Sequence, residues 1–222
     1  MKKILELKKL LKIHNLDGYI VPKNDEFFSE YAFPNRLKTI SNFSGSAGFA
    51  VITISNNYLF VDGRYSIQSK IESGKIFKLI EIPYNYPKDV LNNNKIKKIG
   101  YDPKLFTSSI IKKYFGSKFI LIPIKENLVD AIYYEKEKKI NEFFKIDDKI
   151  AGESVISKIK RLNKILNKKQ LDSIFVSAPE NVAWLLNIRG FDNPNSPIPN
   201  ARLIVDKENN IYFFSNLKKI NT

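Results

Sequence analysis

The hydrophobic positions of this chain follow one pattern twice. Apolar residues between Ile4 and Leu11 recur at the spacing of an amphipathic helix, and an apolar strand is predicted at 16–21. The same order returns in the second half, with an amphipathic stripe over 156–166 and a strand at 171–176. This repetition predicts two related α/β domains.

Each repeat continues in the same way after its first strand. A polar turn and an aromatic-rich helix are predicted at 25–31 in the first copy and at 179–187 in the second. A β-hairpin that turns at an Asn-Asn pair follows in both, over 48–62 and 201–214.

The second copy ends early. The first continues beyond its hairpin with two predicted helices and three predicted strands, at 65–73, 88–92, 77–82, 97–101 and 119–122. The second has only 216–222 after its hairpin, so we expect about half a domain to be missing, through trimming of the chain or in a natural fragment. The strand edge left open should favour pairing with another chain.

A charged run at 135–139 marks the junction between the copies. Ser154 or Glu153 is placed to cap a helix that begins at Val155. We therefore expect a first domain at 1–130, a linker at 131–151, and the first half of a second domain at 152–222.

Composition fits a soluble pair of domains. The 222 residues are 43% hydrophobic and include 16 phenylalanines, enough for two cores. No apolar run reaches the length of about 18 residues that a membrane span needs, and the first residues alternate charged and apolar positions, unlike a signal peptide. The absence of cysteine excludes disulfides and thiolate metal sites, so the expected location is cytoplasmic.

The net charge of +14 raises the question of nucleic-acid binding. The lysines are scattered among Ile and Asn residues, and no zinc-finger, homeodomain or RNA-recognition motif accompanies them. Charge alone supplies only non-specific affinity, so neither a nucleic acid nor a membrane is expected as a partner.

The most informative residues are two blocks at 43–50 and 58–65. The first is a turn of small residues that enters a strand, and the second is a strand that ends in Asp-Gly-Arg. They place Arg64 at a strand end, where its planar guanidinium could meet a peptide carbonyl or carboxylate. The structural alternative is a salt bridge to Asp62 or Glu26.

Other polar candidates favour structural roles. His14 is the only histidine and is expected to be exposed at a helix end, so it cannot form a catalytic site alone. Asp25, Glu26 and Glu30 lie around a predicted helix start, where carboxylates act as caps.

The remaining motifs are also interpreted structurally. Gly45, Gly48 and Gly63 are expected to permit tight turns, because the small-residue turn opens a strand and not the helix that phosphate binding would need. Trp184 is predicted to lie on the buried face of a short helix. A polar, proline-rich loop at 189–199 is predicted to lie at the surface and to carry contacts.

In this order and spacing, the motifs resemble the three-domain, cytosolic type of Xaa-Pro aminopeptidase (aminopeptidase P). The resemblance rests on the two blocks above and on 17–22, 29–31, 99–103, 123–130, 151–154 and 181–190. It implies two creatinase N-terminal-like α/β domains with mixed β-sheets flanked by helices, the second truncated.

The resemblance also implies what this chain lacks. Members of the family carry a further catalytic "pita-bread" domain with a two-metal site of Asp, Asp, His, Glu and Glu, usually loaded with manganese, and nothing in the 222 residues matches it. No catalytic residue, metal ligand or cofactor site is therefore expected here, and the chain alone should be inactive.

In the intact protein, the resemblance implies removal of the N-terminal residue from peptides with proline second. This region would shape the cleft, supply Arg64 as a substrate contact, dock its own C-terminal catalytic domain and support a homodimer. Two alternatives stay open: a stand-alone module that binds peptides or partners, and the front of a related proline dipeptidase or creatinase. The repeat at 181–190 argues against the second.

Overall fold

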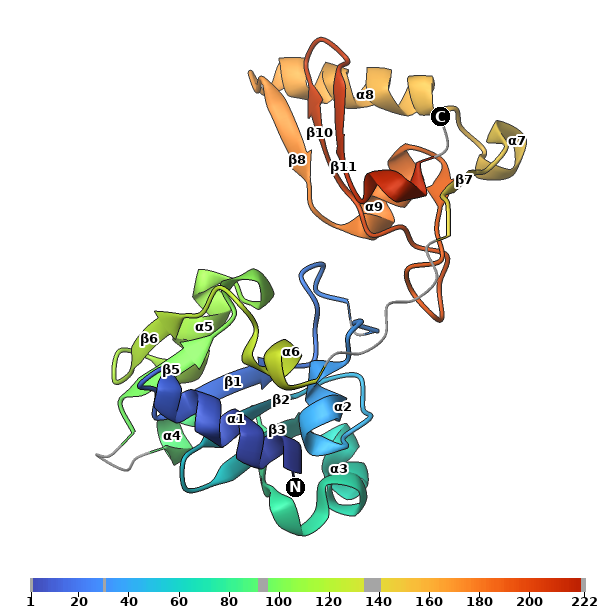
Figure 1. Ribbon diagram of the computed structural model, residues 1–222. Helices are drawn as coiled ribbons and strands as arrows, with labels where there is room; N and C mark the ends of the chain where they lie inside the picture. The colour runs from blue at the N-terminus through green and yellow to red at the C-terminus, as the bar shows by residue number, and fades with distance from the viewer. Residues whose placement is uncertain (1, 30, 92–95, 134–140, 221–222) are drawn as a thin grey trace. The chain divides into compact units, whose positions relative to one another are not determined.

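A computed structural model describes residues 2–29, 31–91, 96–133 and 141–220 (Figure 1). The chain divides into two compact units, Met1–Lys136 and Glu137–Thr222. No sheet or hydrophobic core of the described residues is shared between the units, and each unit is described by itself.

The first unit is built on a six-stranded mixed sheet of order β4-β3-β2-β1-β5-β6. Its strands are β1 (Gly18–Pro22), β2 (Phe49–Thr53), β3 (Asn57–Asp62), β4 (Lys78–Ile82), β5 (Lys98–Tyr101) and β6 (Ile120–Pro123). The β1–β2 and β2–β3 pairs are antiparallel, whereas β3–β4, β1–β5 and β5–β6 are parallel. The order is therefore a central antiparallel meander with parallel strands added at both edges.

Helices cover both faces of this sheet (Figure 1). They are α1 (Lys2–Ile13), α2 (Arg36–Ser41), α3 (Ser66–Ser73), α4 (Pro87–Val90), α5 (Ser108–Phe115) and α6 (Leu128–Ile132), with 3-10 turns η1 (Gly63–Tyr65), η2 (Gly74–Ile76) and η3 (Pro103–Leu105). Local capping fixes several starts. Thr107 accepts the Ile110 amide at α5, and Asn127 accepts the Val129 amide at α6.

The pleat of the central strands separates two cores. Tyr19 and Val21 of β1 point toward α1, α2 and α6, whereas Ile20 between them points toward α5. All three are at most 1% exposed. Because side chains alternate along a strand, a continuous apolar run is what a sheet buried on both faces requires. Burying Ile20 or Val21 contributes about 1.5–3 kcal/mol each.

The second unit repeats the first half of this plan. Its elements are β7 (Phe144–Lys145), α7 (Asp148–Ala151), α8 (Val155–Lys168), β8 (Ser173–Val176), α9 (Pro179–Leu185), β9 (Ile188–Arg189), β10 (Arg202–Asp206), β11 (Ile211–Phe214) and η4 (Leu217–Lys219). The sheet of order β11-β10-β8 is antiparallel, and β7 pairs with β9. Ser154 caps α8 by accepting the Ser157 amide, as the sequence predicts.

Residues 141–220 of this unit pack against only one face of the second sheet. Leu203 and Val205 of β10 are fully buried against apolar residues of α8 and α9. On the opposite face Phe175, Tyr212 and Phe214 are 58%, 51% and 52% exposed. Among residues 141–220, this face of the sheet therefore presents an apolar surface.

The structure confirms the repeated α/β plan and both hairpins, and corrects some details. No helix forms at 25–29 and 31; that segment is a series of turns, and the helix of the first repeat is α2. The helices α5 and α6 were not predicted from the sequence. The whole charged run at 135–139 and Glu30 lie outside the described residues.

Candidate functional site

The candidate site lies at the edge of the first sheet where β1 and β3 end. Because β2 is antiparallel to both, it begins there: Pro22 is paired with Phe49, and Phe49 with Phe60. The loops that follow β1 and β3 and the loop that precedes β2 meet at this edge. The Lys23 amide donates to the Gly48 carbonyl at 3.1 Å and ties two of these loops together.

Arg64 lies in η1, directly after β3, and is oriented by Asp62. One carboxylate oxygen of Asp62 accepts both the Arg64 backbone amide and Nε, each at 3.0 Å, and the other accepts Nη2 at 2.7 Å. The Arg64 side chain remains 72% exposed. Hydrogen bonds from the guanidinium hold the pKa of Asp62 below its usual value. The salt bridge that the sequence offered as an alternative is thus present, and it presents the arginine to solvent.

Tyr65 connects η1 to the small-residue turn. Its hydroxyl lies 2.7 Å from the Ser46 hydroxyl, and its ring meets the Phe43 ring edge-on at 5.6 Å. Gly48 has φ +144°, and a Cβ there would lie 2.8 Å from the Phe60 carbonyl oxygen. The turn therefore requires glycine at that position, as the sequence predicts.

Asp25 closes the loop that follows β1. It is 7% exposed and accepts the amides of Phe27 and Ser29 at 2.9 and 3.0 Å. Burial raises the pKa of Asp25 above its usual value, against the lowering effect of these hydrogen bonds. The predicted capping role is correct in kind, but the capped backbone is a turn and not a helix.

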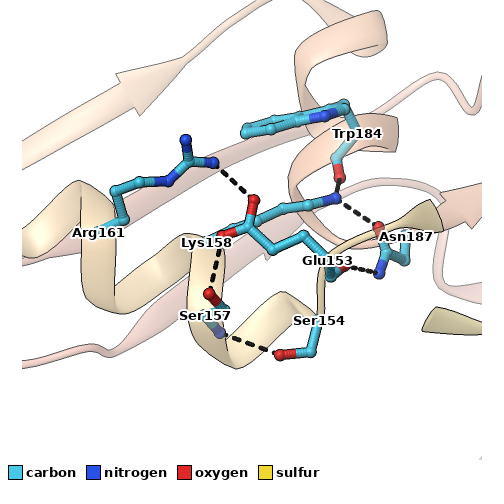
Figure 2. Close-up of polar contacts among 7 residues, drawn as sticks. All are labelled: Glu153, Ser154, Ser157, Lys158, Arg161, Trp184 and Asn187. Carbon is cyan, nitrogen blue, oxygen red and sulfur yellow. Dashed lines mark hydrogen bonds and ion pairs between the residues drawn. The ribbon is translucent and has the colours of Figure 1, made fainter. Parts of the chain in front are cut away.

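The second unit has a polar cluster that the sequence did not single out (Figure 2). Lys158 of α8 is only 3% exposed, and its Nζ donates to the Trp184 carbonyl and to Asn187 Oδ1, both at 2.6 Å. Asn187 in turn donates to the Glu153 carbonyl and to Asp148 Oδ1, both at 2.9 Å. Burial lowers the pKa of Lys158. This network joins the start of α8 to the end of α9.

Trp184 corrects a prediction. Its side chain is 52% exposed, and α9 instead buries Val182, Ala183 and Leu185. Successive side chains of a helix project to different sides of its axis. One residue of a continuous apolar run therefore faces outward. Figure 2 shows the indole beside Lys158 and Arg161, whose Nζ and Cζ lie 4.4 and 5.7 Å from the ring centroid. Such cations stabilise an exposed aromatic ring.

The proline-rich loop after β9 is tied down by Asp192. The Asp192 carboxylate accepts the Asn200 amide at 2.6 Å and forms an ion pair with Lys219, and both side chains of that pair are mostly buried. Arg189 donates to the Ala183 carbonyl at 3.2 Å and to the Ile188 carbonyl at 2.8 Å. These partners organise the loop.

The described residues offer no fit for a two-metal centre, because they contain no group of three or more His, Asp or Glu side chains able to hold an ion. His14 is exposed just after α1. The same part of the chain contains no helix long and apolar enough to cross a bilayer.

A mixed sheet covered by helices, followed by a second unit that repeats its opening elements, defines a class of tandem α/β domain. The chain belongs to the creatinase/prolidase N-terminal domain family: its family models match residues 3–131 and 135–222.

Individual relatives agree with this assignment. A probable Xaa-Pro aminopeptidase P of Laccaria bicolor is 34% identical over 96% of this chain and 35% of its own length. Xaa-Pro aminopeptidase 1 of Dictyostelium discoideum is 35% identical over 99% of this chain and 38% of its own length. The chain thus spans about a third of these relatives and corresponds to their N-terminal region.

A solved structure supports the fold of the whole chain. X-prolyl aminopeptidase from Caenorhabditis elegans, described as a cytosolic enzyme with a di-nuclear active site, matches with a TM-score of 0.86 and 26% identity. The match covers 100% of this chain and 39% of that one. The family expected from the motifs is therefore confirmed.

Proposed function

We propose that this chain is the non-catalytic N-terminal region of a metal-dependent Xaa-Pro aminopeptidase, which removes the N-terminal residue from peptides with proline second. The observation that carries the proposal is the similarity over 96–99% of this chain to about a third of two Xaa-Pro aminopeptidases. Because the chain covers only 35% and 38% of these relatives, the catalytic domain would lie in the rest of the intact protein.

In this proposal Arg64 is the residue that the region contributes to the substrate cleft. Asp62 fixes its orientation through two side-chain hydrogen bonds, so little side-chain entropy remains to be lost when a peptide binds. The exposed guanidinium can still offer donors to a peptide carbonyl or to a terminal carboxylate. Arg64 would act on binding and orientation and would make no bond to the reacting carbonyl.

The metal site and the partners follow from the same reasoning. Two divalent ions, manganese by family resemblance, would be held by the catalytic domain and would activate water there. The region's other partners would be the protein's own catalytic domain and a second copy in a homodimer, in the cytoplasm. The domain limits 1–130 and 152–222 and the linker 131–151 also remain part of this proposal.

A hydrolysis assay tests the function. The 222-residue chain and the product of the complete native reading frame are each incubated with manganese and an Arg-Pro-Pro peptide, with Arg-Ala-Pro as the matched control substrate. We expect release of arginine only by the complete product and only from Arg-Pro-Pro. An inert complete product would instead favour a stand-alone binding module. Cleavage of Arg-Ala-Pro would show that proline in the second position is not required.

A further inference from the structure

Phe28, in the loop that follows β1, has an unusual backbone conformation. Its φ is 60°, in the left-handed region. The other five non-glycine residues of positive φ in the described ranges are four asparagines and one glutamine. Asparagine tolerates this region because its short amide forms local hydrogen bonds, whereas a bulky aromatic residue is strained there. Strain of this kind concentrates at sites of function.

The hydrogen bonds of the loop hold Phe28 in this conformation. Asp25 Oδ1 accepts the amides of Phe27 and Ser29 at 2.9 and 3.0 Å. The Asp25 carbonyl accepts the Phe28 amide at 3.0 Å. The Asn24 side chain donates to that carbonyl and to the carbonyl of the last residue of η3, both at 3.0 Å. One turn therefore satisfies three successive amides, and these bonds offset the strain.

The strain at Phe28 does not serve the hydrophobic core. Phe28 is 48% exposed, and neither core cluster that the described residues form in the first unit includes it. The loop thus holds an apolar ring at the surface on a fixed backbone. A ring held in this way loses little conformational entropy when a ligand covers it, which suits recognition.

The loop of Phe28 leaves the same edge of the first sheet as Arg64. The strands β1 and β3 run in the same direction because each is antiparallel to β2, so the loops that follow them begin at one edge. In Figure 1 the loop after β1 projects beyond the end of that strand. Two strand spacings, about 10 Å, separate β1 from β3, and about three residues of extended peptide span this distance. A peptide in contact with Arg64 can therefore extend to this loop.

We propose that Phe28 is a specificity-determining contact of the substrate cleft, which receives an apolar side chain from the part of the peptide that follows the proline. This inference rests on the proposed function. The bond that an Xaa-Pro aminopeptidase cleaves joins the first two residues of the peptide, and it would lie at the metals of the catalytic domain. The N-terminal region therefore meets the peptide farther along. An aromatic ring selects apolar and aromatic side chains there through burial and ring stacking.

A peptide series measures this preference in the complete reading-frame product. The reference is Arg-Pro-Gly-Gly-Gly, and three further peptides carry a single phenylalanine at the third, fourth or fifth position. For the wild type, we expect kcat/KM for the best of the three to exceed that for the reference by about threefold to tenfold. Phe28→Ala should remove this preference, and Phe28→Tyr should retain it because the ring is kept.

The matched control for the kinetics is Ile13→Ala. Ile13 is 75% exposed and ends α1 shortly before β1 begins, so it lies at the opposite end of the sheet. Its truncation removes an exposed apolar side chain of the same domain and should leave the preference unchanged.

The order of stability of two variants tests the strain separately. Phe28→Gly and Phe28→Ala both remove the ring, but only glycine enters the left-handed region without strain. In urea unfolding of the 222-residue chain, the Gly variant should therefore have the higher midpoint. At Ile13, which is helical, the order should reverse, because alanine has the higher helix propensity.

A preference that persists in Phe28→Ala, or no preference in an active wild type, would overturn the inference and leave the proposed function standing. A higher midpoint for Phe28→Ala than for Phe28→Gly would remove the strain on which the inference depends and would overturn it as well. A complete product that cleaves none of these peptides would reject the proposed function, and the substrate contact with it.

Discussion

The guanidinium of Arg64 and the carboxylate of Asp62 form a side-by-side pair of hydrogen bonds, Nε to Oδ1 at 3.0 Å and Nη2 to Oδ2 at 2.7 Å. Asp62 also accepts the Arg64 amide and so begins the turn that carries its own partner. One aspartate therefore fixes both the backbone and the side chain of the candidate substrate contact. The contribution of this ion pair to stability can be tested by lowering the pH.

The substitution Asp62→Asn should lower the free energy of unfolding at pH 7 by no more than about 1 kcal/mol, the usual range for an exposed ion pair. The folded pKa of Asp62 is depressed by Arg64, so its stabilisation is present above the unfolded pKa and is lost as pH falls through the folded pKa. Urea titrations at pH 7 and below pH 3 measure this difference. The deficit of the variant should disappear in acid; a deficit of equal size at both pH values would show that the ion pair contributes nothing.

The effect of Asp25 on stability should depend on pH in the opposite direction to that of Asp62. Burial raises its pKa, so the folded state favours the protonated carboxyl, and the wild type gains stability as pH falls through the folded pKa toward the unfolded one. Asp25→Asn keeps an oxygen for the Phe27 and Ser29 amides and removes the buried charge. This variant should therefore be at least as stable as the wild type at pH 7, with an advantage that shrinks in acid.

The matched control is Asp25→Ala, which loses both accepted hydrogen bonds. This substitution should lower the free energy of unfolding by about 0.5–2 kcal/mol, as the loss of a capping residue does. Thermal unfolding of the three proteins at pH 7 and pH 4 gives the comparison. An Asn variant that is as unstable as the Ala variant would contradict the assigned effect of burial.

Gly48→Ala should be among the most destabilising single changes in the first unit. Its φ of +144° is strained for any other residue, and the new methyl group would lie 2.8 Å from the Phe60 carbonyl oxygen. We expect a loss of about 3 kcal/mol or more from strain and displacement of β3 combined. Gly152→Ala is the control: its φ is +78° with no atom within 4 Å of the added group, so about 1 kcal/mol is expected. If denaturant titrations gave equal losses of unfolding free energy for Gly48→Ala and Gly152→Ala, a steric contribution at Gly48 would be excluded.

Lys158→Met should destabilise the second unit by about 1–3 kcal/mol, because the Trp184 carbonyl and Asn187 Oδ1 both lose a donor at a buried position. The methionine retains much of the apolar stem, so packing is largely preserved. The exposed Lys160→Met on the same helix is the control and should change little. Trp184 is the only tryptophan, so its fluorescence follows unfolding of this unit specifically. An equal midpoint for both variants would show that the network is not stabilising.

The repeated order of elements could be predicted from the sequence because it rests on apolar periodicity and turn residues. The stripe from Ile4 to Leu11 and its copy in α8 each bury one helix face, and both hairpins turn where asparagines occur. The helix α6 could not be predicted from the sequence because it is only five residues long. Its stability depends on packing against α1 and α2 more than on the helix propensity of its residues.

The candidate site was predictable only in part. Arg64 could be predicted because the motif Asp-Gly-Arg ends an apolar strand. Its ion-pair partner, Asp62, lies only two residues away in the sequence. The Lys158–Asn187 contact joins residues of different helices, and no local pattern marks it. Trp184 was assigned to the core because its neighbours are apolar, although helix geometry turns it outward. Hydrophobic composition does not fix which side of a helix faces the core.

The most direct measurement is the kinetics of Arg-Pro-Pro hydrolysis by the complete reading-frame product, its Arg64→Ala variant and a Lys207→Ala control. Lys207 is also an exposed cation paired with an aspartate, Asp172, at 2.6 Å. We expect the wild type and the control to cleave the peptide equally, and Arg64→Ala to lose about tenfold to a hundredfold in kcat/KM, mainly through KM. An inactive wild-type product, or an Arg64→Ala variant that matches the control, would contradict the role assigned to this region.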